Sequence, residues 1–273
     1  MLGYQLYQLV YFVQLEFYRS MKNNFFCKLI LLILISNPLL AENLNIESKS
    51  ISIDKKTKLT IFKDSVVAVD SKDNQFKTEY AVYDKEKGLL KSKGQTEIVT
   101  SEKFYVRGEN MIFDNSNNVI KSNSSVIVTD LEGNEIFMDK FEYSTKNKFF
   151  RSTGNIKIID SKKNSYNFSQ IYIDEVKREI LGTDIKAFIN EDGFKVNKKN
   201  KPRVFANTVN IKKNISTFEK SVFTICNYRE NDKCPPWSLQ SGQMRHDKNN
   251  KTIYYDNALI KFYDIPIFYL PKL

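Results

Sequence analysis

The chain has 273 residues, and its 42 Lys and Arg against 32 Asp and Glu give a formal charge of +10 at pH 7. With one histidine, three cysteines and no glycine-rich phosphate loop, it offers no plausible Ser-His-Asp set and no cluster of metal ligands. We therefore expect a protein that is not an enzyme and that has no cofactor or metal.

Residues 1–41 have the pattern of an N-terminal extension followed by a secretory signal peptide, which we expect to be helical. Lys22 supplies positive charge, residues 29–35 form an unbroken apolar run, and Ala41 is a small residue suited to cleavage. The run is shorter than the roughly 20 apolar residues of a transmembrane helix, which favours a signal peptide. A single N-terminal anchor helix is the alternative. Met21 is an alternative start of the chain.

Cleavage after residue 41 would leave 39 basic and 31 acidic residues, a formal charge of +8. A basic chain favours an anionic partner, such as an acidic polysaccharide or a phosphorylated lipid. Export argues against nucleic acid as the partner. Because the lysines are spread through the turns, solubilising charge explains them equally well.

A pattern recurs every thirty residues along the rest of the chain. Each copy holds an apolar strand end, then usually Asp, a turn rich in Lys and Asn, and a second apolar stretch. The anchors of this pattern are Ile53, Tyr83, Phe113, Tyr143 and Ile173, with looser copies at Ile211 and His246. A fixed period of this length indicates one supersecondary unit stacked on itself, which builds an extended surface rather than a compact catalytic pocket.

Between the anchors, apolar and polar residues alternate with period two, which is typical of β-strands, and no helical periodicity of useful length follows residue 41. We predict an all-β fold, an elongated jellyroll-like stack of repeated antiparallel strands in which each repeat supplies two strands. A parallel β-helix usually has shorter coils, and a globular sandwich has no reason for so constant a period.

The same alternation predicts an apolar trough that runs lengthwise between two sheet faces. The candidate lining residues are Val67, Val69, Ile98, Val126, Val128, Ile156, Ile158 and Phe188. A slip of one residue would turn every one of these side chains outward.

We divide the chain after the signal into a repeat region, 42–220, and a terminal region, 221–273. In an oxidising compartment, Cys226 and Cys234 either close a small loop with each other or reach more distant partners. Cys234 is followed by Pro235, Pro236 and Trp237. Further motifs are the Asn257-Ala258 pair and the apolar segment IPIFYLP at 265–271.

These terminal motifs together resemble the end of the periplasmic domain in the lipopolysaccharide-assembly outer-membrane protein family, which is also called LptD or OstA-like. There, a cysteine-containing stretch, a Pro-Trp element, an Asn-Ala pair and an apolar Pro-rich segment lead into a membrane barrel. The repeats at 44–219 are similar to the OstA-type β-jellyroll of that family. The resemblance covers almost all of the chain after the signal.

The resemblance implies a non-catalytic, periplasmic lipid conduit associated with the outer membrane. Its implied partners are lipopolysaccharide, another OstA-like jellyroll joined by edge-strand pairing, and an outer-membrane barrel. The chain departs from the family because it stops at Leu273, where the barrel would begin. Either the chain is a split or truncated form, or the barrel is encoded separately. A Cys226–Cys234 disulfide is then the simplest pairing without barrel cysteines.

Two other functions stay open. One is the soluble periplasmic bridge protein of the same pathway. The other is a β-solenoid scaffold or adhesion module without lipid cargo, which predicts a tightly filled interior with no continuous cleft.

Overall fold

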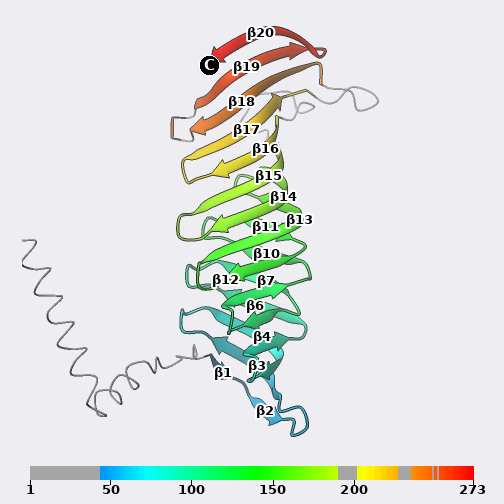
Figure 1. Ribbon diagram of the computed structural model, residues 1–273, viewed down its shortest axis with the longest axis vertical. Helices are drawn as coiled ribbons and strands as arrows, with labels where there is room; N and C mark the ends of the chain where they lie inside the picture. The colour runs from blue at the N-terminus through cyan, green and yellow to red at the C-terminus, as the bar shows by residue number, and fades with distance from the viewer. Residues whose placement is uncertain (1–43, 190–201, 227–234, 248, 251) are drawn as a thin grey trace, which may run out of the picture. The chain divides into compact units, whose positions relative to one another are not determined.

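A computed structural model describes residues 44–189, 202–226, 235–247, 249–250 and 252–273 (Figure 1). The residues from Glu42 to Leu273 form one compact unit, which is described by itself below. The described part of this unit is built from β-strands and turns alone, which confirms the all-β prediction. No helix in it is long and apolar enough to cross a membrane. The expected signal helix at 1–41 lies outside the described residues, and the boundary at 220 stays a prediction.

Twenty strands join in one antiparallel sheet. In chain order they are β1 Asn45–Glu47, β2 Ser50–Ile53, β3 Thr60–Val69, β4 Gln75–Asp84, β5 Leu89–Ser92, β6 Gln95–Val99, β7 Tyr105–Glu109, β8 Ile112–Asp114, β9 Val119–Ser122, β10 Val126–Thr129, β11 Glu135–Met138, β12 Phe141–Ser144, β13 Phe149–Ile159, β14 Ser165–Asp174, β15 Glu179–Phe188, β16 Arg203–Ile211, β17 Ile215–Thr224, β18 Trp237–Asp247, β19 Thr252–Phe262 and β20 Ile265–Lys272.

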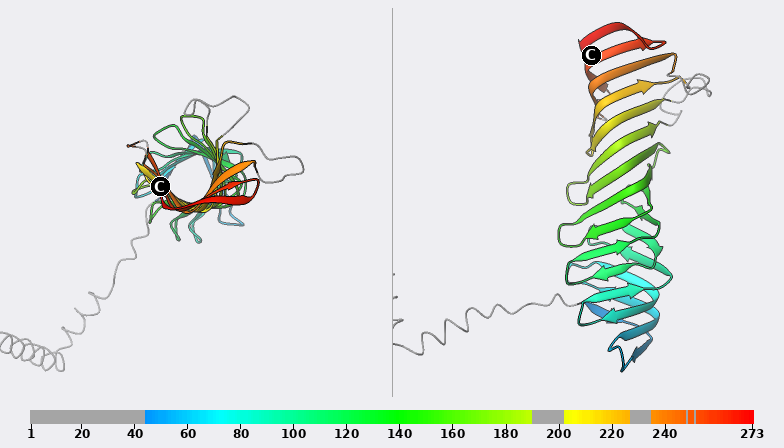
Figure 2. Two further views of the ribbon diagram at one scale, coloured as in Figure 1. Left: turned by 90° about the horizontal axis from the view of Figure 1, so that it is seen from above. Right: turned by 45° about the vertical axis from the view of Figure 1, so that its right-hand side comes forward.

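The pairing forms two ladders that share their long strands. Ladder A joins β1, β3, β4, β6, β7, β10, β11 and β13. Ladder B joins β2, β3, β4, β5, β8, β9, β12 and β13. From β13 to β20 every strand bends across both ladders. Seen from above, the strands wind around a common axis (Figure 2). The expected jellyroll-like stack of antiparallel strands is thereby confirmed.

The bend between the ladders is called the corner here, and it repeats along the stack. Asp64, Gly94, Gly154 and Asp184 lie at corners and have positive φ angles of 63°, 84°, 110° and 53°. The value at Gly154 lies well outside what a side chain tolerates, so glycine is required at that corner. These residues let the chain change direction without leaving either ladder.

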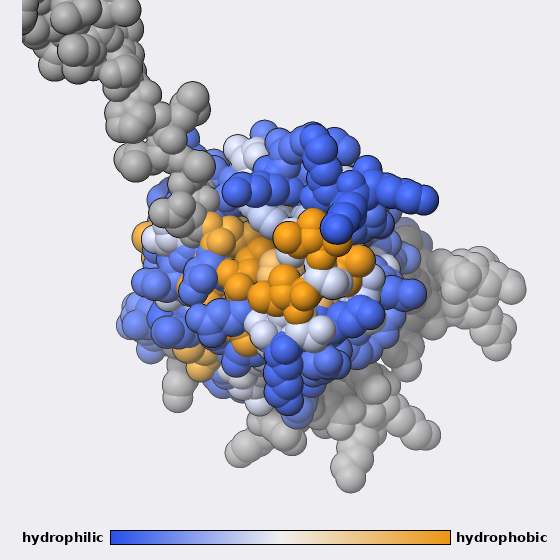
Figure 3. Space-filling model, turned by 90° about the horizontal axis from the view of Figure 1, so that it is seen from below, coloured by the Kyte–Doolittle hydropathy of each residue, from blue (hydrophilic) through white to orange (hydrophobic). Residues whose placement is uncertain are grey.

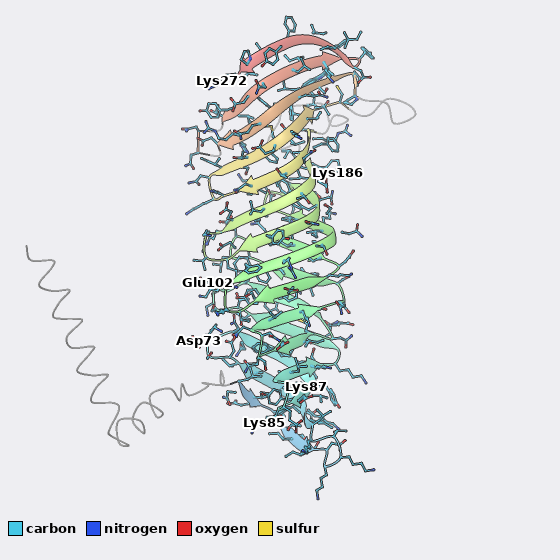
Figure 4. The ribbon with its side chains drawn as sticks, in the orientation of Figure 1. Asp73, Lys85, Lys87, Glu102, Lys186 and Lys272 are labelled. Atoms are coloured by element: carbon cyan, nitrogen blue, oxygen red, sulfur yellow. The ribbon has the colours of Figure 1, made fainter. Side chains whose placement is uncertain are left out.

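Turns close the strands at the side opposite the corner, which is called the seam. The seam turns of ladder B are those that the thirty-residue pattern predicts. Ladder A has a second series that begins at Asp70, Thr100, Asp130 and Asp160. In this series Asp70 accepts hydrogen bonds from the Lys72 and Asn74 amides at 2.9 and 2.8 Å. Figure 4 shows Asp73 and Glu102, from successive turns of this series, one above the other along one edge.

The hydrophobic core lies between the two ladders. Ladder A contributes buried side chains such as Val66, Ile98 and Val126, and ladder B contributes Leu90 and Ile120. Polar residues face outward at the alternate positions of most strands. This alternation keeps one face of each strand out of water, which is the main stabilising term for such a stack.

Candidate functional site

The interior of the stack is the candidate site, and five of the eight expected lining residues face it. The buried residues of this set are Ile98, Val126, Val128, Ile156 and Ile158, each at most 4% exposed. All five lie in ladder A, on β6, β10 and β13, which are joined through β7 and β11. Whether they contact lipid stays a prediction.

The inward placement of Val67, Val69 and Phe188 is wrong. Val66 and Ala68 are buried instead, at 1% and 0% exposure, and Val67 and Val69 are half-buried on the opposite face. The thirty-residue register contains the signal that identifies the inner face, because Val66 lies sixty residues before the buried Val126.

The prediction for Phe188 is wrong for a different reason. Phe188 lies thirty residues after the buried Ile158, so the thirty-residue register also predicts an inward side chain there. The corner of β13 holds two residues between the ladder positions Thr153 and Ile156. The corner of β15 holds only Asp184, between Thr183 and Ile185. One residue fewer reverses the alternation, so Ile185 and Ala187 are buried and Phe188 is not.

Aromatic side chains fill the middle of the interior. The ring of Phe150 lies 5.5 Å from Phe104, 5.6 Å from Phe141 and 4.5 Å from Tyr143, measured between centroids. Phe150 and Tyr143 are fully buried. The expected trough is therefore occupied here by the protein's own rings, and hydrocarbon tails would have to displace them.

Polar contacts close the seam beside these rings. The buried Glu175 carboxylate accepts hydrogen bonds from the Thr100 hydroxyl and the Tyr143 hydroxyl, both at 2.7 Å. Burial raises the pKa of Glu175, and these two hydrogen bonds oppose the rise. Lys148 pairs with Glu102 at 2.5 Å across the same seam. Ladders A and B are thus fastened together on the side opposite the corner.

A small cavity of about 110 Å³ lies farther along the seam. It reaches core residues of both ladders, Ile136 of ladder A and Ile173 of ladder B. Leu131 and Arg178 line it as well. Sequence reasoning did not find this opening, because it depends on which turns of the two ladders lie opposite each other.

A larger groove of about 1020 Å³ follows the corner. Outward-facing residues of ladder A line it, among them Arg107, Phe137 and Lys186, and Val126 and Ile156 border it at the corner ends of their strands. Lys186 is labelled in Figure 4. This groove therefore lies outside the expected trough.

The N-terminal end of the interior is open. Ile51 and Ile53 of β2 are 58% and 68% exposed. Ile51 lies opposite Phe62, a core residue, so it stands on the inner face, and none of the described strands covers it. Figure 3 shows an apolar patch at the centre of this end, surrounded by hydrophilic residues.

The C-terminal end is also open and apolar. β20 pairs only with β19, and Phe268 lies opposite Ile260, which packs against the core. Phe268 is nevertheless 63% exposed, and Leu273 is 56% exposed. Both ends of the stack thus expose apolar inner-face side chains together with strand edges that lack a partner in the described chain.

The terminal motifs contribute to packing near this end. Trp237 lies with its ring centroid 6.1 Å from that of Phe223, and its carbonyl accepts a 2.7 Å hydrogen bond from Thr224. Cys226 is half-buried and its sulfur is free in the structure. Cys234 lies outside the described residues, so the expected disulfide stays a prediction.

Within the described residues, no group of His, Cys, Asp and Glu side chains is arranged to hold a metal ion. Neither protein-family models nor curated proteins match the chain. Among solved structures, the chain is similar to LptH, the LptA-homologous periplasmic component of the lipopolysaccharide transport device from Pseudomonas aeruginosa. The identity is 12%, the match covers 52% of this chain and 82% of that chain, and the TM-score is 0.24. This score indicates only a loose superposition, so the function proposed next rests on this chain's own residues.

Proposed function

We propose that this chain is a non-catalytic periplasmic domain that conducts lipopolysaccharide toward the outer membrane, with acyl chains held between ladders A and B. The observation that carries the proposal is the pair of apolar, uncovered ends. Repeat proteins that stand alone normally close their ends with polar capping units. Apolar ends such as Ile51 and Phe268 favour a stack that continues into another molecule.

The chemistry of the cargo supports the same function. Exposing a methylene group to water costs about 0.8 kcal/mol, so a lipid with several acyl chains needs an apolar path through an aqueous compartment. The inner faces of ladders A and B supply apolar side chains from one end of the stack to the other. The basic charge of the chain suits the phosphates of an anionic lipid.

Partner binding would use the strand edges at the two ends. Tyr255 and Leu273 exchange both backbone hydrogen bonds, at 2.8 and 2.9 Å. Because hydrogen-bonded and non-bonded pairs alternate in an antiparallel ladder, the amide groups of Leu270 and Lys272 point away from β19. They are available to a strand of another OstA-like jellyroll, and an outer-membrane barrel is the expected recipient beyond it.

A second candidate function is a scaffold or adhesion module without lipid cargo. The filled middle of the interior, around Phe150, favours it, because a conduit must open there. The soluble bridge protein of the same pathway shares the conduit mechanism. It differs in lacking a barrel attachment.

Photocrosslinking in cells tests the conduit. A photoreactive amino acid replaces Ile51 or Ile98, which face the interior, and Ile127, which faces outward on β10, serves as the control. The conduit predicts lipopolysaccharide attached at positions 51 and 98 and none at 127. Attachment from the outward position alone, or from no position, would leave the scaffold as the better function.

A further inference from the structure

The seam contains a regular series of cross-seam contacts, called rungs here. Each rung joins the third residue of a ladder A turn to a residue 46 positions later, which lies in a ladder B turn and has a positive φ angle. Lys72 donates to Asn118 at 2.5 Å in the first rung. Lys148 donates to Glu102 at 2.5 Å in the second.

The third rung is open. The spacing assigns it to Glu132 and Arg178, a pair with opposite charges that suits a salt bridge. Within the described residues, however, neither side chain takes part in an ion pair. Both line the seam cavity of about 110 Å³ instead. The seam therefore closes at the first two rungs and opens at the third.

The turn beside the open rung also departs from its own repeat. The second residue of the ladder A turns is Ser71, Ser101 and Ser161 in three cases and Leu131 in the fourth. Leu131 is 57% exposed and lines the cavity. Asp130 still accepts hydrogen bonds from the Glu132 and Asn134 amides at 2.8 and 2.9 Å, so the turn itself keeps its shape.

The cavity connects this exposed leucine to the interior. Its inner walls are Phe104, Ile136 and Ile173, which are 7%, 1% and 2% exposed. Its rim carries Arg178 and Lys213, and neither has an ion-pair partner among the described residues. Apolar walls with cationic groups at the mouth match a molecule with a hydrocarbon tail and an anionic head.

We propose that this opening, the third-rung slot, binds one acyl chain of an anionic amphiphile from the side, with its phosphate near Arg178. The proposal rests on the conduit function and assigns a lateral binding site to it. A pocket for a drug-sized ligand has a volume of roughly 300–1,000 Å³, so the slot admits the end of a single chain rather than a whole lipid. Covering Leu131 removes exposed apolar surface from water, and the guanidinium group of Arg178 binds phosphate oxygens in bidentate fashion.

The test uses the purified chain and a lysophosphatidic acid that carries a photoreactive diazirine at the end of its single chain. After illumination, mass spectrometry locates the label on the digested protein. We expect label within 130–136 and at Ile173 or Ile180, with competition by the unlabelled lipid. The variant Leu131→Ser, which restores the residue of the other turns, should lower this labelling severalfold.

Two further variants separate charge from shape. Arg178→Ala removes a charge-assisted contact to phosphate and should weaken binding by about tenfold. Ser161→Leu places the same apolar residue in the next turn, away from the open rung, and should leave labelling of the slot unchanged. Equal labelling of the slot in the wild type, Leu131→Ser and Arg178→Ala would overturn the proposal.

The position of the label also distinguishes the slot from the conduit. Label near Ile51 and Phe268 with none around Leu131 would overturn the slot and leave the conduit intact. Label at none of these inner positions would count against both.

Discussion

Tyr143 donates a hydrogen bond from its hydroxyl to Oε2 of Glu175 at 2.7 Å, and the two residues are only 0% and 2% exposed. The two residues come from successive copies of the ladder B turn region, and Thr100 of ladder A holds the other carboxylate oxygen at 2.7 Å. One buried acid thus links three turns across the seam. Burial favours the neutral form of this acid, whereas the two hydroxyl hydrogen bonds favour its charged form, and burial is the larger effect.

The first prediction concerns the pH dependence of stability. Because the pKa of Glu175 in the folded chain lies above its ordinary value of 4.5, the folded state binds the proton more tightly than the unfolded state. The stabilisation from this proton is present below pH 4.5 and is lost as the pH rises through the folded-state pKa. Glu175→Gln should flatten this part of the curve.

Urea unfolding at a series of pH values between 4.5 and 8 measures the effect. The exposed Glu86, which pairs with the exposed Lys58 at 3.5 Å, provides the control variant Glu86→Gln. If the unfolding free energies of Glu175→Gln and Glu86→Gln both depend on pH as that of the wild type does, then the buried carboxyl does not couple stability to pH.

The second prediction tests which face of the strands is inner. Phe150 is fully buried among three aromatic rings, and its replacement by Ala should cost about 3–5 kcal/mol of unfolding free energy. Phe188 is half-buried on the outer face, so Phe188→Ala should cost less than half as much. Chemical denaturation of both variants under the same conditions gives the comparison. Equal losses of unfolding free energy would indicate that Phe188 faces the interior.

Much of the fold follows from the sequence because a single period governs it. The anchors at Phe113 and Tyr143 mark strand ends in both the sequence and the structure. The period does not determine how many residues each corner holds, and that number sets the inner face. The one-residue difference between the corners at Gly154 and Asp184 is invisible to alternation alone.

The ladder A turns also leave a pattern in the sequence. Asp70 and Asn74 recur as Asp130 and Asn134 and again at 160 and 164, as regularly as the residues of the ladder B turns. The rungs were not detectable. Their offset of 46 residues reflects how the twisted ladders bring their turns together across the seam, which no local pattern records.

The third prediction concerns a glycine that faces the core. A Cβ atom on Gly182 would lie 2.3 Å from Cδ1 of Phe168, so Gly182→Ala forces the ring to move. Overpacking of this kind costs about 1–3 kcal/mol. Gly242 gives a matched control, because its Cβ would lie 3.6 Å from the nearest atom and its φ is not positive. Thermal unfolding should show a clear loss for Gly182→Ala and little change for Gly242→Ala.

The fourth prediction concerns the open ends, which the conduit needs for contact with a neighbour. Ile51 and Ser50 are adjacent on the edge strand β2, and Ile51 faces the apolar interior whereas Ser50 faces away from it. If apolar ends join end to end, the purified chain that begins at Glu42 should increase in average mass with concentration. Ile51→Lys should suppress this association, because a charged lysine in the apolar interior cannot be buried cheaply.

Sedimentation analysis over a range of protein concentrations measures the association. Ser50→Lys adds the same charge to the same strand on its other face, and it should reduce association much less than Ile51→Lys. Equal effects of the two variants would mean that edge charge, rather than the apolar interior, controls the contact. A chain that stays monomeric in all three forms at high concentration would show that the ends do not join copies of this chain. The exposed Phe268 and Ile51 would then have to be covered by a different partner.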